Sequence, residues 1–297
     1  MGFVPLIEVT RGNLAECQHW GAVAVADCNG RVLAQVGDPY TVTFTRSTIK
    51  AFQALPFMQS GGAQALGWGA DELALLCASH NGEAMHVEQV ERMLGSVGQN
   101  YRALRCGCHR PLFAELGLGS LPDGFVPDER HNNCSGKHAG FVAHCVQQGW
   151  PLDNHLDPAH PLQRAIRERV AQAVGLGPEQ LVMGIDGCSA PNYAMPLAHL
   201  ARGYARLAGG APDTDLHESL TALADAMVAR PELGSGTGRH DLDFMQVGQG
   251  DWVSKTGADG VQVVGSRSRG EAFALKIMDG NMTAQVAAAV EVMDQLG

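Results

Sequence analysis

The chain has 297 residues, 45% of them hydrophobic and 18% charged, which is enough for a large core in a single domain over residues 1–297. Its net charge of −10 argues against nucleic acid or an anionic membrane as a partner. No stretch has the uninterrupted apolar length of a membrane span, and no basic region followed by an apolar core marks a secretory signal. We therefore expect a cytoplasmic protein whose eight cysteines are reduced, some of them candidate metal ligands.

Strand signals dominate the start of the chain. Residues 20–26 and 31–36 are β-rich runs around Asn29-Gly30, a dipeptide that favours a tight hairpin turn. Residues 41–45 predict another short strand, which leads into a helical run. Pro56 is expected to kink or divide that run, because proline lacks the N–H that continues a helix.

The middle of the chain is predicted to be helical, because apolar residues recur at helical spacing and glycines follow the expected helix ends. The predicted helices cover residues 83–98, 135–148, 161–174, 193–207 and 214–229, the last one capped near Asp213 or Thr214. Residues 233–238 are rich in glycine but lack the lysine of a P-loop, so we expect a flexible loop there.

The C-terminal part returns to strands. They are predicted at residues 251–256, 261–266 and 272–278, and a helix over 281–296 closes the chain. Strands at both ends with helices between them predict a mixed α/β (α+β) fold. We expect one central antiparallel sheet, built from residues of about 1–46 and 250–280, flanked by helices and joined to a helical region over 47–249.

Three short motifs point to serine chemistry. Ser47 and Lys50 share one face of a helix start, where a lysine kept neutral by burial can activate the hydroxyl and backbone N–H groups can stabilise an oxyanion. Ser79-His80-Asn81 and Lys255-Thr256-Gly257 follow in the order seen in penicillin-binding proteins and class A β-lactamases. Each motif taken alone has an ordinary structural explanation: the first as a helix cap, the second as a serine in a loop and the third as a surface lysine. The ordered set instead favours a serine β-lactamase-like layout.

Two cysteines suggest a second site. Cys134 opens a predicted helix in a dense polar segment, and Cys188 follows a predicted strand-to-loop turn. Two thiolates with one further protein ligand suit a tetrahedral zinc ion that keeps an open position. The candidate third ligands are His131, Lys137, His138 and Asp186; chemistry alone prefers His138, since a lysine must first lose its proton. The spacing matches no standard zinc motif, and two ordinary buried cysteines are the alternative interpretation.

Together these motifs resemble those of the rhizobial-type L-asparaginases, the L-asparaginase II family, over nearly the whole chain. The segments that carry the resemblance are Arg46-Ser47-Thr48-Ile49-Lys50, Ser79-His80-Asn81-Gly82-Glu83, Asn132-Asn133-Cys134-Ser135-Gly136-Lys137-His138, Asp186-Gly187-Cys188 and Lys255-Thr256-Gly257. The resemblance implies a serine β-lactamase/glutaminase-like fold, a homodimer, and hydrolysis of L-asparagine to L-aspartate and ammonia. It also implies two Ser-Lys pairs, Ser47/Lys50 and Ser79/Lys255, and one zinc ion per subunit on Cys134, Lys137 and Cys188, with water completing the shell.

For this reaction we expect Ser47, activated by Lys50, to attack the side-chain carboxamide carbon, while Ser79 and Lys255 relay a proton to the departing ammonia. A zwitterionic substrate needs a cation for its α-carboxylate and anions for its α-amine. Arg46 is the candidate cation, although a surface arginine is an equal alternative, and Glu83 and Asp186 are candidate anions that could equally be structural caps. The full set of substrate-binding candidates is Arg46, Asn81, Glu83, His138 and Asp186.

Other classes of protein fit parts of this pattern. A penicillin-interacting hydrolase shares the Ser-Lys chemistry but is normally exported, and no export signal is present. A glutaminase differs only by one substrate methylene, worth about 1–3 kcal/mol of discrimination. A non-catalytic zinc-binding or amino-acid-binding module would keep its function after Ser47→Ala, whereas an amidohydrolase would not.

Overall fold

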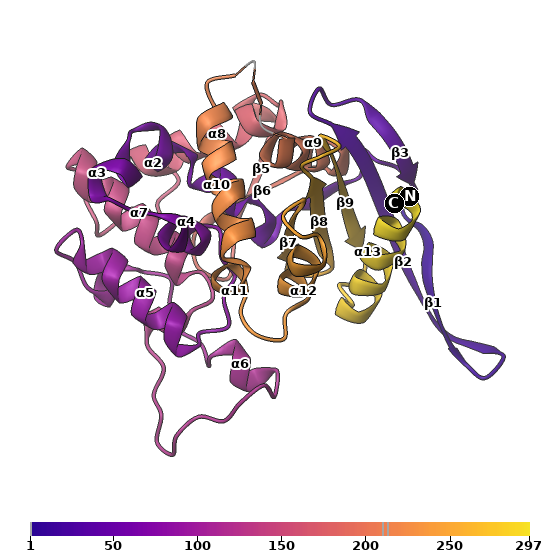
Figure 1. Ribbon diagram of the computed structural model, residues 1–297, viewed down its shortest axis with the longest axis horizontal. Coiled ribbons are helices and arrows are strands. Elements are labelled where there is room, and N and C mark those ends of the chain that lie inside the picture. The colour runs from indigo at the N-terminus through magenta and orange to yellow at the C-terminus, as the bar shows by residue number, and fades with distance from the viewer. Residues whose placement is uncertain (1, 210, 213) are drawn as a thin grey trace.

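The computed structural model describes residues 2–209, 211–212 and 214–297. A six-stranded antiparallel sheet assembled from both ends of the chain forms its centre (Figure 1). The strands are β1 (Val4–Arg11), β2 (Leu14–Asp27), β3 (Val32–Val36), β7 (Trp252–Gly257), β8 (Val261–Ser266) and β9 (Glu271–Ile277). They run in the order β1-β2-β9-β8-β7, and β3 pairs with β2. The predicted sheet from both chain ends is confirmed, and β1 was not predicted.

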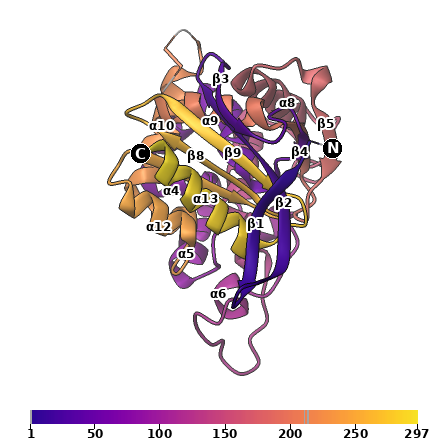
Figure 2. The ribbon, with the colours of Figure 1, turned by 90° about the vertical axis from the view of Figure 1, so that its right-hand side faces the viewer.

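Helices cover both faces of this sheet. α9 (Leu197–Gly209) packs on one face and α13 (Met282–Leu296) on the other, as Figure 2 shows for α13 in front of the strands. The alternation of side chains along β2 sends Ala22, Ala24 and Ala26 into the core that contains α9, and Val23 and Val25 into the core that contains α13. Because both faces of β2 are covered at residues 22–26, these five consecutive residues are all apolar.

A second, three-stranded sheet was not predicted. It consists of β4 (Val42–Phe44), β6 (Pro191–Pro196) and β5 (Val182–Ile185), in the order β4-β6-β5. The prediction that residues 41–45 belong to the central sheet is therefore wrong, and so is the helix predicted from residue 193, which begins only at Leu197. Pro196 disfavours a helical conformation for the residue before it, and strand pairing with β4 and β5 decides the rest.

The helical region between the sheets contains most of the remaining elements. They are η1 (Arg46–Ile49), α1 (Lys50–Gln53), α2 (Leu55–Gln59), α3 (Gly62–Leu66), α4 (Ala70–Leu76), α5 (Ala84–Gly95), η2 (Tyr101–Ala103), α6 (Leu112–Glu115), η3 (Glu129–His131), α7 (Ser135–Gln148), α8 (Pro161–Val174), η4 (Pro178–Gln180), α10 (His217–Ala229), α11 (Pro231–Gly234) and α12 (His240–Val247). In these described ranges, no helix is both long enough and apolar enough to cross a bilayer.

Local signals set several of these boundaries. α7 and α8 have the predicted bounds, and the glycines after them, Gly149 and Gly175, are left-handed with φ of 66° and 72°. Pro56 is the second residue of α2, so the first helical run is divided there as predicted. Of the two residues predicted to cap α10, Asp213 lies outside the described residues, and Thr214 does not cap the helix, which begins at His217 after Leu216 without a side-chain cap. Thr214 Oγ1 instead accepts a hydrogen bond from the Leu216 N–H at 3.3 Å, directly before the helix.

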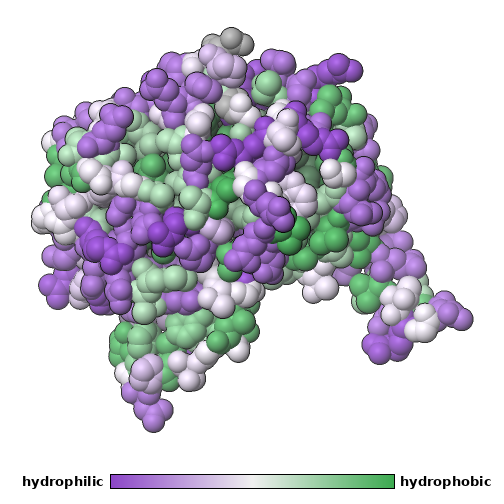
Figure 3. Space-filling model, in the orientation of Figure 1, coloured by the Kyte–Doolittle hydropathy of each residue, from purple (hydrophilic) through white to green (hydrophobic). Residues whose placement is uncertain are grey.

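Two segments project from the body in Figure 1: the β1–β2 hairpin, and the long loop between η2 and η3 that carries α6. The second projection shows hydrophobic surface in Figure 3, and its exposed apolar residues include Leu116, Leu118 and Val126. Leu112 and Leu116 of this segment line a cavity that also contains Ser47, so the projecting loop forms one wall of the candidate site.

Candidate active site

The backbone before Ser47 is strained and firmly held. Arg46 has a left-handed φ of 51°, which costs a non-glycine residue about 1–3 kcal/mol and is typical of functional sites. Asn192 of β6 holds it from both sides: its Oδ1 accepts from the Arg46 N–H at 3.1 Å, and its Nδ2 donates to the Arg46 carbonyl at 2.8 Å. The small second sheet therefore fixes the start of the turn that presents Ser47. No sequence signal pointed to Asn192.

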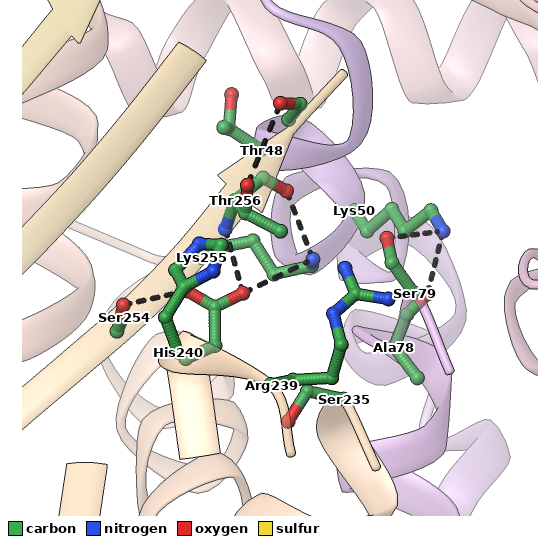
Figure 4. Close-up of polar contacts among 12 residues, drawn as sticks. Thr48, Lys50, Ala78, Ser79, Ser235, Arg239, His240, Ser254, Lys255 and Thr256 are labelled. Atoms are coloured by element: carbon green, nitrogen blue, oxygen red, sulfur yellow. Dashed lines mark hydrogen bonds and ion pairs between the residues drawn. The ribbon is translucent and has the colours of Figure 1, made fainter. Parts of the chain in front are cut away.

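Lys50 contacts Ser79 (Figure 4). Its Nζ lies 2.9 Å from Ser79 Oγ, 2.5 Å from the Ala78 carbonyl and 3.4 Å from the Asn133 carbonyl, and its side chain is 1% exposed. Each of the three donors of an ammonium group thus has an acceptor. The predicted pairing was Ser47/Lys50, but among the described residues no side-chain hydrogen bond of Ser47 is found, and Lys50 joins Ser79 instead.

Lys255 brings a second buried amine to the site from β7. Its Nζ donates to the Thr256 carbonyl at 3.0 Å and lies 3.8 Å from Asp241 Oδ2, and only 3% of the residue is exposed. Burial lowers the pKa of Lys255 to about 7, with Lys50 and Arg239 contributing and Asp241 opposing. The neutral amine is therefore accessible near pH 7. In the described part of the chain, no hydrogen bond joins Lys255 to Ser79, the partner predicted for it.

Asp241, at the start of α12, is the anion beside Lys255. The carboxylate accepts hydrogen bonds from Ser254 Oγ at 2.7 Å, the Thr256 N–H at 2.7 Å and Gln262 Nε2 at 3.0 Å. Burial alone would raise the pKa of Asp241, but Lys255, His240 and these donors lower it to about 2. No sequence signal pointed to Asp241, because its partners follow it by 13 residues or more and no motif links them.

Ser47 and Ser79 line one cavity of about 260 Å³, which Asn133, Arg239 and Thr256 also border. A neighbouring cavity of about 310 Å³ shares Ser47 and reaches Cys134 and Cys188. The glycine of Lys255-Thr256-Gly257 lets β7 approach the Ser47 turn, because a Cβ on Gly257 would stand 2.9 Å from the Thr45 carbonyl oxygen. All three predicted motifs therefore meet at one place.

The predicted substrate-binding residues divide into two groups, the first of which is an ion-pair cluster. Arg46 Nη2 lies 2.9 Å from Asp186 Oδ1, and the Arg46 guanidinium also pairs with Asp259. The cation and one of the anions expected to hold opposite ends of a substrate thus bind each other. Both still line the cavity that reaches Cys134 and Cys188.

The second group supports a loop. Asn81 Nδ2 donates to Glu83 Oε1 at 3.1 Å and to the Thr237 carbonyl at 2.9 Å, while Glu83 accepts from the Thr237 N–H at 2.8 Å. Burial opposes ionisation of Glu83, but the hydrogen bonds from Thr237 and Asn81 lower its pKa overall. His138 lines neither cavity; its Nδ1 bonds to the Leu104 carbonyl at 2.9 Å.

The predicted metal ligands come together beneath the second cavity. Lys137 Nζ lies 3.1 Å from Cys188 Sγ, and both Cys134 and Cys188 are buried. Cys134 Sγ donates to Asn133 Oδ1 at 3.1 Å. The proximity of Cys188 and burial raise the pKa of Cys134, while the proximity of Cys134 and of Lys137 lowers the pKa of Cys188 against the effect of burial. His138 Nε2 is buried close by and makes no hydrogen bond among the described residues. Burial lowers the pKa of His138, and the nearby Cys188 opposes this.

This donor set suits zinc, since two buried thiols and an amine lie together. In the described ranges no group of three or more His, Cys, Asp and Glu residues could hold a metal, so a site here needs the lysine or a rearranged His138. The other ligands considered, His131 and Asp186, are engaged by Asp128 and Arg46.

Sequence comparison places the chain among enzymes that hydrolyse amides. The sequence model described as L-asparaginase II matches residues 7–297, and the chain belongs to this family. The resemblance seen in the sequence is thereby confirmed. A search of curated proteins finds no match.

Similar solved structures include a β-lactamase from Mycobacterium bovis, with 15% identity over 93% of this chain and 94% of that one and a TM-score of 0.47. Another is a mutant simvastatin synthase from Aspergillus terreus, with 11% identity over 93% of each chain and a TM-score of 0.37.

Proposed function

We propose that the protein is an L-asparagine amidohydrolase, which converts L-asparagine and water to L-aspartate and ammonia. The observation that carries this proposal is that Ser47 and Ser79 line one cavity, with Lys50 bonded to Ser79 and Lys255 bonded to the cavity-lining Thr256, in a chain of the L-asparaginase II family. Such a cluster supplies a nucleophile, a relay hydroxyl, a fixed cation and a neutral amine, which together cover the needs of amide hydrolysis.

In the proposed reaction Ser47 Oγ attacks the carboxamide carbon and passes its proton to the neutral amine of Lys255. Backbone N–H groups at the start of η1 stabilise the oxyanion. Lys50 supplies a proton through Ser79 to the departing nitrogen, so that the carbon–nitrogen bond breaks and ammonia leaves. Water then cleaves the ester on Ser47, releasing L-aspartate and restoring both lysines. The contacts favour Lys255 over Lys50 as the activating base, because Lys50 already donates to three acceptors.

We also propose that Cys134, Lys137 and Cys188 hold one zinc ion, as expected for this family. When bound, the ion would supply positive charge next to the cavity and hold together the segments that carry its ligands. The homodimer expected from the family belongs to the same proposal. A solution mass of about twice 31.4 kDa in light scattering would support it, and a mass near 31.4 kDa at the assay concentration would contradict it.

The test is ammonia release from L-asparagine and from L-glutamine by the zinc-loaded protein. We expect turnover of L-asparagine that is lost in Ser47→Ala and strongly reduced in Ser79→Ala. Ser268→Ala, an exposed serine remote from the cavity, is the matched control and should behave as the unmodified chain. Faster release from L-glutamine would make the protein a glutaminase. No release from either amide by well-folded protein would refute an amidohydrolase and favour a binding module.

A further inference from the structure

Arg239 places a guanidinium in the candidate site that the sequence analysis did not single out. It follows the glycine-rich segment of residues 233–238, whose first two residues end α11, and it directly precedes α12. Its side chain borders the cavity that contains Ser47 and Ser79. Figure 4 shows the guanidinium between the Lys255 and Ser79 side chains, pointing into the group of catalytic candidates.

No carboxylate neutralises Arg239 within the described part of the chain. Its side-chain hydrogen bond there goes from Nη1 to Asn81 Oδ1 at 3.2 Å, and it takes part in no ion pair. Burial lowers the pKa of Arg239, with Asp241 opposing. By contrast, Arg46 is paired with both Asp186 and Asp259. A half-buried guanidinium without an anion carries a desolvation cost that a bound carboxylate offsets.

The carboxylates near Arg239 are engaged by other groups. Asp241 lies 3.8 Å from Lys255 and accepts hydrogen bonds from Ser254, the Thr256 N–H and Gln262. The other local carboxylate, Glu83, is occupied by Thr237 and Asn81. Neither acid pairs with Arg239, so the guanidinium is left for the free carboxylate of a substrate.

The loop before Arg239 is packed in a way that fixes the guanidinium. Gly236 has a φ of 109°, and a Cβ there would lie 2.6 Å from Asn81 Nδ2. Glu83 and Asn81 both bond to Thr237. The segment expected to be a flexible loop is thus anchored on Asn81 at the two residues that precede Gly238 and Arg239. Asn81 has a positioning role in this arrangement, because one side chain binds both the loop and the guanidinium.

We infer that Arg239, rather than Arg46, binds the α-carboxylate of the substrate, so that the enzyme selects amides of α-amino acids over amides that lack this carboxylate. The inference rests on the proposed function. With Nη1 bonded to Asn81, Nη2 and Nε remain for the two oxygens of a carboxylate, the paired geometry in which arginine excels.

The test compares L-asparagine with 3-aminopropanamide, which keeps the amine and the carboxamide but lacks the α-carboxylate. The unmodified enzyme should prefer L-asparagine by kcat/KM. Arg239→Gln should lower kcat/KM for L-asparagine about 100-fold, mainly through KM, with a much smaller loss for 3-aminopropanamide, so the preference collapses. Arg46→Gln should retain the preference. Collapse of the preference in Arg46→Gln but not in Arg239→Gln would overturn the inference.

A binding measurement separates this inference from the proposed function. Calorimetric titration of L-aspartate into Ser47→Ala should show binding that a further Arg239→Gln change weakens about 100-fold. If the protein turns over no amide but this loss is seen, the proposed function fails and the carboxylate site stands. Equal affinity with and without Arg239 overturns the site whatever the turnover. Arg239→Lys, with an intermediate loss expected, serves if Arg239→Gln does not fold.

Discussion

Asp241→Asn should move the pH dependence of turnover toward acid. In the proposed reaction the neutral form of Lys255 is active, so kcat/KM should rise with pH through an apparent pKa of about 7. Asp241 opposes this low value, because its negative charge favours the ammonium form of Lys255. Removing that charge lowers the pKa of Lys255 further.

The distance sets the size of the effect. Two unit charges 3.8 Å apart interact by about 4 kcal/mol at an effective dielectric constant of about 20, and about 1.4 kcal/mol corresponds to one pKa unit. The upper limit is therefore a shift of about 3 units. Relaxation around the new amide reduces it, and we expect the rising limb to move by about 1–2 units toward lower pH.

The assay is kcat/KM for L-asparagine between pH 5 and pH 9, which is a range chosen to bracket the value of about 7. The position of the limb is independent of any overall loss of rate caused by weaker contacts to Ser254 and Gln262. Asp251→Asn is the matched control, because this carboxylate accepts a hydrogen bond from Ser266 and borders neither of the two cavities that Ser47 lines. The rising limb of the pH profile of this variant should coincide with that of the unmodified enzyme. A limb that stays in place in Asp241→Asn, or moves toward alkali, would refute Lys255 as the titrating base.

Three further changes probe the scaffold. Asn192→Ala should lower kcat more than it raises KM, and it should lower the free energy of unfolding by about 1–3 kcal/mol, because the Arg46 backbone loses both hydrogen bonds to the Asn192 amide. An unchanged kcat in steady-state assays would contradict this role of Asn192. Gly257→Ala should destabilise the chain by about 1–3 kcal/mol in denaturant titration, since its Cβ meets the Thr45 carbonyl, and unaltered unfolding would contradict that packing. A chelator should remove one zinc ion per chain and lower Tm, and Cys188→Ser should contain less zinc before any chelator is added. If elemental analysis finds no zinc bound even after zinc is supplied, the site is ruled out.

Local sequence signals account for much of the fold. Asn29-Gly30 marks the β2–β3 turn, Gly149 and Gly175 end their helices, and the K-T-G strand lies in the central sheet as predicted. The errors arise where distant segments pair. Residues 193–196 have a composition that suits a helix, yet β6 is held as a strand by partners from two other parts of the chain.

In the candidate site, too, local motifs were predictable from the sequence and contacts between distant residues were not. The three motifs meet in the folded chain, with Ser47, Ser79 and Thr256 at one cavity, because the motifs mark turns and strand positions. They did not give the partner of each lysine, which depends on side-chain direction in the folded chain. Arg239 was also missed. A basic residue directly after a glycine-rich loop and before a helix start was the one signal available for it.

The assembly of the central sheet has a consequence for how the chain folds during synthesis. β2 pairs with β9, so the N-terminal hairpin exposes an unsatisfied edge until residues near 277 have been made. Both apolar faces of β2 also wait for helices that appear late, α9 and α13. Such non-local pairing slows folding and leaves the growing chain prone to aggregation, so the nascent protein should depend on chaperones until translation ends.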